Sequence, residues 1–166
     1  MVSAWNGTQL FSSASTEWST PQALYDHLHS RFNFSLDAAS NGMNSKCPSY
    51  LVDALTQPWD CPTKAVWLNP PWGRGIGRFL DQAILQSREH KLTVVCLVPA
   101  CTDTLWWSRY AWAAAEIWFL TGRLHFVRED GHTGPCTKGA AILVYTPWHT
   151  GDPQTRLMNK EEWAEG

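Results

Sequence analysis

Hydrophobic positions along the chain recur with two different spacings, and the two alternate from one end of the chain to the other. Leu24, Leu28 and Phe32 follow one another at four-residue intervals, which predicts a helix with one apolar face. Ser19-Thr20-Pro21 stands just before this face. A hydroxyl cap followed by a proline at the first helical position is a typical helix start, so we expect the helix to begin there.

Strand-like segments lie between the expected helices. Residues 92–98 form a continuous apolar, β-branched run, which is typical of a central strand buried on both faces. Further strands are expected at 32–37, near 50–52, and at 65–68, 116–120, 122–127 and 140–145. Further helices are expected over 76–89 and 102–115 and within 156–164. This alternation predicts an α/β fold with a mostly parallel central sheet.

A single domain is expected to account for most of the chain. Residues 1–17 are rich in Ser, Thr, Gly and Asn and are expected to form an irregular arm. Residues 18–150 contain the periodic segments and form the expected domain, and 151–166 are expected to be a polar tail. A chain of 166 residues, 44% hydrophobic and 17% charged, is large enough to bury its own core.

Composition and charge narrow the classes of function. The formal net charge of −2 argues against general electrostatic binding of nucleic acid, so any such contact must be local. Eleven tryptophans in a chain of this size indicate that some indoles serve as stacking surfaces, besides those in the core.

The cysteines and the apolar runs indicate where the protein works. The five cysteines include no C-x-x-C pair and no Cys/His spacing typical of zinc, so no metal is expected. Their odd number and the lack of a signal peptide favour free thiols in a reducing compartment, and hence the cytoplasm. No apolar run approaches the ~20 residues of a membrane-spanning helix, so no membrane contact is expected.

Several of the expected strands end in chemically distinctive residues. Asp37 ends the first strand, Asn69 follows the strand 65–68, and Thr102-Asp103 comes soon after the strand that ends at Pro99. In mostly parallel sheets, ligands bind beyond the carboxyl ends of the strands. The sequence therefore predicts a binding site at this edge of the sheet.

The run Asn69-Pro70-Pro71-Trp72 can be interpreted in two ways. As a plain turn, the prolines end the strand because they have no N–H to donate, and Asn is a common turn residue. As a site, the Asn69 side-chain oxygen and the carbonyl freed by the rigid prolines form two acceptors, which suit an NH₂ group. Trp72 would stack on the ring that carries this group. The run then predicts a clamp for an aromatic amine of adenine or cytosine, stabilising charge that develops only in the transition state.

The same tetrapeptide resembles the (D/N/S)-P-P-(Y/F/W) motif of amino-methyltransferases that use S-adenosylmethionine. Other segments agree in order, namely "EWSTPQALYDHL", "FNFSLDAA", "CPSYL", "VWLNPPWG", "VVCLVPACTDTLWW" and "GRLHF". From about Trp18 to Tyr145 the chain therefore resembles the phage-type DNA N6-adenine methyltransferase family. The resemblance implies a Rossmann-like methyltransferase fold, with helices on both faces of the sheet and no separate target-recognition domain. It also implies methyl transfer to the N6 amine of adenine in DNA.

The resemblance also implies roles for individual residues. Asn69 and the carbonyl of Pro70 would hold the amine beside the rigid Pro71, and Trp72, where the family usually has Tyr, would stack on the flipped base. Asn at the first position favours the N6 amine of adenine and leaves the N4 amine of cytosine open. S-adenosylmethionine, which becomes S-adenosylhomocysteine, would be bound by Trp18, Thr20, Pro21, Asp37, Ala38, Ala39 and Asn69. A carboxylate at Asp37 suits the amino group or ribose hydroxyls of this cofactor, although Asp37 also fits a plain turn.

DNA contacts are expected around the clamp. Arg74, Arg78 and Arg123 could hold phosphates, and Thr102 and Asp103 could line the base pocket, although each also fits an ordinary surface or helix cap. The target base would have to be flipped out of a duplex or be single-stranded. Without a second domain, we expect a short or relaxed target sequence, or a homodimer instead of a monomer.

Two other kinds of function remain open at this point. The same chemistry could act on RNA or on a protein glutamine, or the chain could be a non-catalytic module that binds nucleic acid. A phage origin, with the host cytoplasm as the site of action, is suggested by the resemblance.

Overall fold

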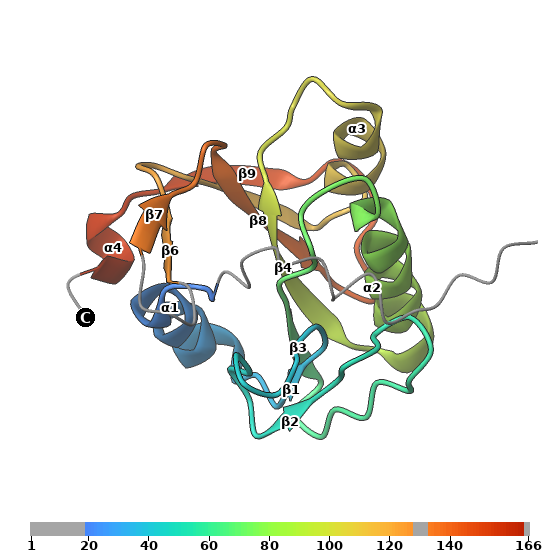
Figure 1. The fold of residues 1–166 in the computed structure, drawn as a ribbon. Helices are drawn as coiled ribbons and strands as arrows, with labels where there is room; N and C mark the ends of the chain where they lie inside the picture. The colour runs from blue at the N-terminus through green and yellow to red at the C-terminus, as the bar shows by residue number, and fades with distance from the viewer. Residues whose placement is uncertain (1–18, 128–132, 165–166) are drawn as a thin grey trace, which may run out of the picture.

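A seven-stranded sheet forms the centre of the computed structural model, which describes residues 19–127 and 133–164 (Figure 1). Its strand order is β2-β1-β3-β4-β8-β5-β9. Within this order β8 runs antiparallel to both of its neighbours, and every other neighbouring pair is parallel. The predicted mostly parallel α/β sheet is therefore confirmed. The strands are β1 (Leu36–Asp37), β2 (Ser49–Tyr50), β3 (Ala65–Leu68), β4 (Thr93–Pro99), β5 (Glu116–Leu120), β8 (Ala140–Tyr145) and β9 (Gln154–Met158).

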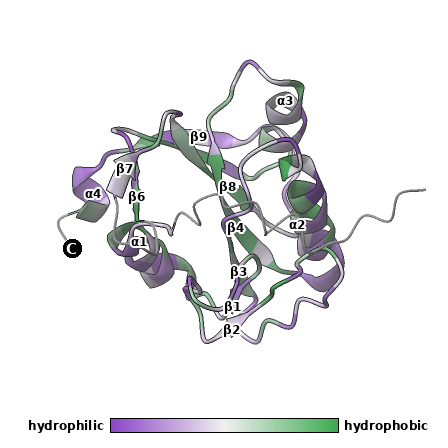
Figure 2. Ribbon diagram, viewed as in Figure 1, coloured by the Kyte–Doolittle hydropathy of each residue, from purple (hydrophilic) through white to green (hydrophobic). Residues whose placement is uncertain are grey.

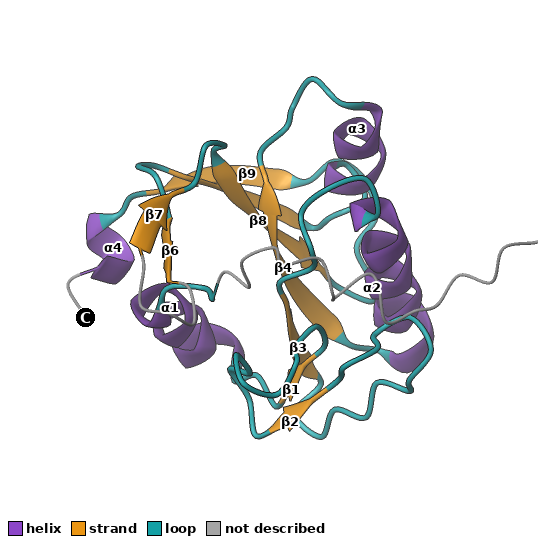
Figure 3. Cartoon of the chain, in the orientation of Figure 1, coloured by secondary structure: helices purple, strands orange, loops and turns teal. Residues whose placement is uncertain are grey.

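Helices cover both faces of the sheet (Figure 3). Successive strand residues point to opposite faces, so Val66 and Leu68 of β3 join one core cluster while Ala65 and Trp67 join the other. The first cluster packs against α2 (Ile76–His90) and α3 (Leu105–Ala111), and the second against α1 (Gln22–Phe32) and α4 (Glu161–Ala164). Hydrophobic colour follows the central strands, whereas the helices carry both hydrophilic and hydrophobic colour (Figure 2).

The start of α1 differs from the prediction. The helix begins at Gln22 with Pro21 as its N-cap residue, and no side chain caps it. The expected hydroxyl cap is wrong because the hydroxyl of Thr20 accepts a hydrogen bond from the side chain of Asn69 instead. The strand expected at 32–37 is also shorter, since α1 continues to Phe32 and Asn33 ends it in the left-handed conformation, with φ 57°.

The last part of the chain belongs to the sheet. A helix was expected within 156–164, but residues Gln154–Met158 form β9, which pairs in parallel with β5, and only Glu161–Ala164 are helical. The expected polar tail thus includes an edge strand whose last residue, Met158, is fully buried. Most other side chains of β9 are exposed, so the strand carries no apolar run.

A second, two-stranded sheet consists of β6 (His125–Val127) and β7 (Thr133–Pro135), which pair antiparallel. The strand expected at 122–127 thus begins three residues later, and β7 lies in a segment for which no strand was predicted. The helix expected at 102–115 is also shorter: it spans Leu105–Ala111, and the hydroxyl of Thr104 caps it by accepting from the N–H of Trp107. Among the described residues, no helix is long and apolar enough to span a membrane.

Candidate functional site

A cavity of about 470 Å³ opens at the carboxyl ends of β1 and β3. Its size falls within the range of about 300–1,000 Å³ that small-molecule sites usually have. Four stretches of the chain line it: Ser19 and Thr20; Asp37, Ala39, Ser40, Asn41, Asn44 and Lys46; Trp67, Asn69, Pro70, Pro71 and Trp72; and Phe126, Gly134, Pro135, Cys136, Thr137 and Lys138. The cavity thus lies at the predicted edge of the sheet. Asp37 and Asn69, which were expected at the ends of two strands, both line it.

Asn69 is held in place by a residue far away in the chain. Its Nδ2 donates a hydrogen bond of 3.2 Å to the hydroxyl oxygen of Thr20, which is only 3% exposed. An amide that donates through its nitrogen on one side turns its oxygen, an acceptor, to the other side. Pro70 and Pro71 follow, and because neither has an N–H, the pairing of β3 ends there.

Trp72 is half-buried and fixed by two contacts. Its Nε1–H donates to the carbonyl oxygen of Leu97 in β4 at 3.2 Å. Its ring meets that of Phe126 edge-on, with centroids 5.4 Å apart and an interplanar angle of 89°. The polar edge of the indole is therefore satisfied by protein, so its remaining contribution to the cavity is aromatic surface.

Asp37 places a carboxyl group in the wall of the cavity with only 2% exposure. Its Oδ2 accepts from the backbone N–H of Lys46 at 2.9 Å, and its Oδ1 accepts from that of Ala39 at 3.3 Å. Burial raises its pKa from 3.8 to about 6, although both N–H groups and the Lys46 charge act in the opposite direction. The carboxylate is therefore ionised at neutral pH and suits a ligand that supplies hydroxyl or amino hydrogens.

Lys46 lies at the same side of the cavity. Its ammonium group donates to Oε1 of Gln22 at 2.9 Å. Burial lowers the pKa of this lysine, against the charges of Asp37 and Asp26.

Most of the predicted cofactor and clamp residues come together in the cavity. Thr20, Asp37, Ala39, Asn69, Pro70, Pro71 and Trp72 all line it. Pro21 lies next to them as the N-cap of α1, and Ala38 is fully buried behind the wall, where its N–H donates to the carbonyl of Trp67 at 2.9 Å. Trp18 lies outside the described residues.

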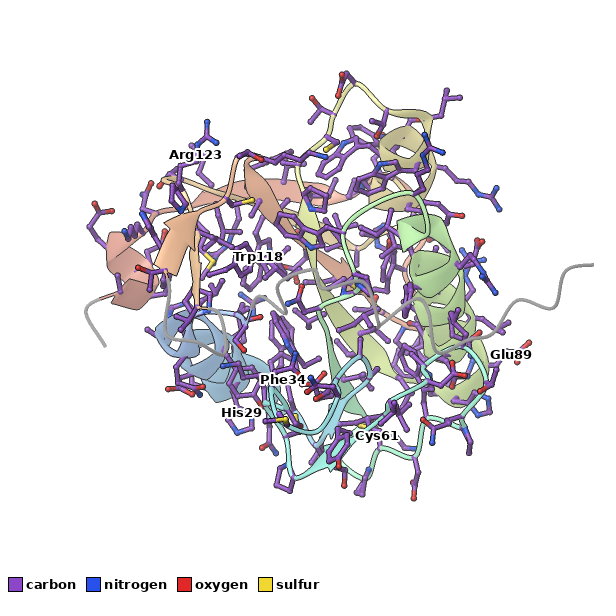
Figure 4. The ribbon with its side chains drawn as sticks, viewed as in Figure 1. His29, Phe34, Cys61, Glu89, Trp118 and Arg123 are labelled. Atoms are coloured by element: carbon purple, nitrogen blue, oxygen red, sulfur yellow. The ribbon has the colours of Figure 1, made fainter. Side chains whose placement is uncertain are left out.

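Of the six residues predicted to contact DNA, Trp72 lines the cavity, and the other five lie on the surface away from it. Arg74, Arg78, Thr102, Asp103 and Arg123 are all exposed. Arg74 stands in the loop before α2 and Arg78 in its first turn. Arg123 points outward (Figure 4), and its Nη1 donates to the carbonyl of Cys136 at 2.9 Å. That these five exposed residues contact DNA stays a prediction.

Sequence reasoning missed two parts of the wall. One is the loop 40–46, where Asn44 Oδ1 accepts from the Ser40 hydroxyl and from the N–H of Asn41. Its signal in the sequence was the run of Asn, Ser and Gly, which indicated only a turn. The other is the segment 134–138, which carries Thr137 and Lys138 and for which no role in the site was predicted. In the described part of the chain, no three His, Cys, Asp or Glu side chains are grouped so that they could hold a metal ion.

Comparison with known proteins gives consistent matches. Residues 7–165 match the sequence model of a family described as DNA N-6-adenine-methyltransferase (Dam). The chain is 30% identical over 159 residues to a DNA N-6-adenine-methyltransferase of Escherichia phage T1, covering 82% of this chain and 65% of that protein. It is 29% identical over 138 residues to a DNA N-6-adenine-methyltransferase of Haemophilus phage HP1 (strain HP1c1), covering 78% of each. The chain thus spans about two thirds to four fifths of the length of these relatives.

Proposed function

The chain belongs to the DNA N-6-adenine-methyltransferase family, and we propose that it transfers a methyl group from S-adenosylmethionine to the N6 amine of adenine in DNA. The single observation that carries this proposal is the clamp: Asn69, with its amide nitrogen bonded to Thr20, stands in the same cavity as the buried Asp37. The sheet, with its antiparallel β8 between β4 and β5 and helices on both faces, supports a Rossmann-like methyltransferase fold.

The cavity fits S-adenosylmethionine by size and chemistry. Its volume of about 470 Å³ suits a nucleoside with an amino-acid extension, and the carboxylate of Asp37 would accept from ribose hydroxyls or from the amino group. When bound, this cofactor supplies an electrophilic methyl group on its sulfonium. We assign its binding to Thr20, Pro21, Asp37, Ala38, Ala39 and Asn69, together with Trp18.

The clamp residues act on the amine. The lone pair of an adenine N6 amine is conjugated into the ring, so the amine is a poor nucleophile. Asn69 Oδ1 and the carbonyl of Pro70 would accept its two hydrogens and favour the tetrahedral geometry in which the lone pair is free. Because that geometry develops along the reaction, these acceptors stabilise the transition state more than the ground state. Pro71 would keep the turn rigid, and Trp72 would present its ring to the base.

A base inside a duplex does not reach this cavity, so the enzyme would flip it out or use single-stranded DNA. We assign phosphate contacts to Arg74, Arg78 and Arg123, and contacts near the base to Thr102 and Asp103. With a net charge of −2, the chain depends on such local contacts, which favours a short or relaxed target sequence.

The test begins with the product. Purified protein is incubated with labelled S-adenosylmethionine and with unmethylated DNA, RNA or protein, and the digested products are identified by mass spectrometry. We expect N6-methyladenine in DNA. Methylation confined to RNA, to protein or to cytosine would contradict the proposal, and failure to bind S-adenosylhomocysteine in calorimetry would favour a non-catalytic module.

Two matched variants test whether Asn69 acts in methyl transfer. Asn69→Ala should lower kcat by about 100-fold or more, as the loss of a preorganised transition-state contact does, and should weaken S-adenosylhomocysteine binding by at most about tenfold, as the loss of one hydrogen bond does. Asn159→Ala removes a similar amide at an exposed Thr–Asn pair outside the cavity and should leave kcat unchanged. Full activity of Asn69→Ala would refute the assignment of the clamp.

A further inference from the structure

The backbone on both sides of Thr20 is anchored to other elements. The N–H of Ser19 donates to the carbonyl of Val127 in β6 at 3.0 Å, and the carbonyl of Pro21 accepts from the N–H of Tyr25 in α1 at 3.2 Å. Thr20 itself is 3% exposed. Its hydroxyl group is therefore held at a fixed point of the cavity wall, 49 positions before its partner Asn69.

This hydroxyl does not have the local role that its sequence position predicts. A threonine just before a helix usually caps it by accepting from a backbone N–H, but α1 has no side-chain cap. The oxygen of Thr20 instead accepts from Nδ2 of Asn69 at 3.2 Å. A helix start without its cap hydrogen bond and a part-buried long-range bond in its place indicate a function for this threonine in the site.

The orientation of the Asn69 amide decides whether the clamp works. A carboxamide has an acceptor on one side and a donor on the other, and a half-turn about its last bond exchanges them with little change of shape. With Nδ2 toward Thr20, the oxygen is free to accept from an amine. After the half-turn, an NH₂ group would face an NH₂ group, and no hydrogen bond would form.

We propose that Thr20 is a positioning residue that fixes the Asn69 amide with its oxygen toward the target amine. This role rests on the proposed methyl transfer. Accepting from Asn69 leaves the hydroxyl hydrogen of Thr20 for an acceptor on a ligand in the cavity, and that second bond keeps the oxygen in its accepting role. Binding of a ligand in the cavity and the orientation of the Asn69 amide are thereby coupled through the side chain of Thr20.

Three substitutions test this role. Thr20→Val keeps the shape but has no hydroxyl, Thr20→Ser keeps the hydroxyl, and Thr121→Val is the matched control, since Thr121 donates to Oδ1 of Asn159 at 3.1 Å outside the cavity. We expect Thr20→Val to lower kcat on DNA about 10-fold to 100-fold and to weaken S-adenosylhomocysteine binding by at most about tenfold, since the ligand loses one hydrogen bond. Thr20→Ser and Thr121→Val should keep kcat within about threefold.

A direct readout comes from the side-chain amide of Asn69 in ¹⁵N-labelled protein, assigned by the signal that Asn69→Ala loses. In the wild type with S-adenosylhomocysteine, one of the two amide protons should be shifted downfield and protected from exchange. In Thr20→Val both should exchange like solvent-exposed amides. This measurement on the wild type decides the matter even if Thr20→Val does not fold.

The outcomes separate the two proposals. If wild-type protein methylates no DNA, the proposed function fails, whereas the amide signal still reports the hydrogen bond. If wild-type protein methylates DNA but Thr20→Val keeps its kcat, or loses cofactor affinity instead of kcat, the positioning role is refuted. An unprotected Asn69 amide in the wild type refutes it as well.

Discussion

The ionised carboxylate of Asp37 should lower the stability of the protein. Burial raises its pKa from 3.8 to about 6, and the carboxyl is only 2% exposed. Between these two values, the folded state binds the proton more tightly than the unfolded state does. The free energy of unfolding therefore decreases as the pH rises from about 3.8 to about 6, and it stays low above that range. The total loss is about 3 kcal/mol.

Replacing this residue by a group that does not ionise removes that pH dependence. In Asp37→Asn the amide oxygen can still accept from the N–H of Lys46, which lies 2.9 Å from Oδ2 in the wild type. At pH 4.5 the wild type has lost about 1 kcal/mol of the total, and at pH 8 nearly all of it. The stability of the variant relative to the wild type should therefore be about 2 kcal/mol higher at pH 8 than at pH 4.5.

Urea unfolding followed by circular dichroism at both pH values measures this difference. Comparing one variant with itself at two pH values cancels any packing change that does not depend on pH. Asp60→Asn, at an exposed position, controls for the loss of one negative charge. If Asp37→Asn shifts stability equally at pH 4.5 and pH 8, the Asp37 carboxyl is not destabilised by burial and the reasoning fails.

Three further predictions follow from the same structure. At pH 5 only about a tenth of Asp37 should be ionised, so calorimetry should find S-adenosylhomocysteine binding about tenfold weaker than at pH 8; Asp37→Asn, which does not titrate, should show no such pH dependence. Trp72→Phe keeps an aromatic face but loses the hydrogen bond to the carbonyl of Leu97, so chemical unfolding should show a loss of about 1 kcal/mol while kcat falls far less than in Trp72→Ala. Met158→Ala should lower the free energy of unfolding by about 2–5 kcal/mol, because Met158 is fully buried; a change near zero would mean that β9 is not part of the core.

Strands buried on both faces could be predicted from the sequence almost to the residue. The expected segments 65–68, 116–120 and 140–145 are confirmed as β3, β5 and β8, because their apolar runs reflect burial in the centre of the sheet. The edge strand β9 could not be predicted in this way, since four of its five side chains are exposed and its pairing with β5 is made by the backbone. The hydropathy of side chains carries no information about which backbone segments pair.

Parts of the site were predictable from distinctive chemistry at a strand end, and other parts, such as Thr20 and Ala39, only from the family resemblance. Asp37 and Asn69 have such chemistry and do line one cavity, and the predicted family is confirmed by the match over 7–165. The bond between Thr20 and Asn69 could not be predicted, because local sequence contains no information about a partner 49 positions away and indicated only a helix cap at Thr20. Lys138 was not predicted to line the cavity. Its part of the wall follows a separate two-stranded sheet, and tertiary packing decides where that sheet lies.

The cavity is assembled from stretches on both sides of the exposed residues 62–64, which precede β3. A chain divided at this point would place Thr20 and Asp37 on one polypeptide and Asn69 and Trp72 on the other. Neither piece would contain both the carboxylate that we assign to the methyl donor and the residues that we assign to the amine clamp. The pieces would restore both by pairing β1 with β3 and by re-forming contacts such as that between Thr20 and Asn69. If the chain methylates DNA as proposed, a methylated base would then record that two separately expressed fragments had met, so the architecture suits a split reporter that leaves a lasting chemical mark.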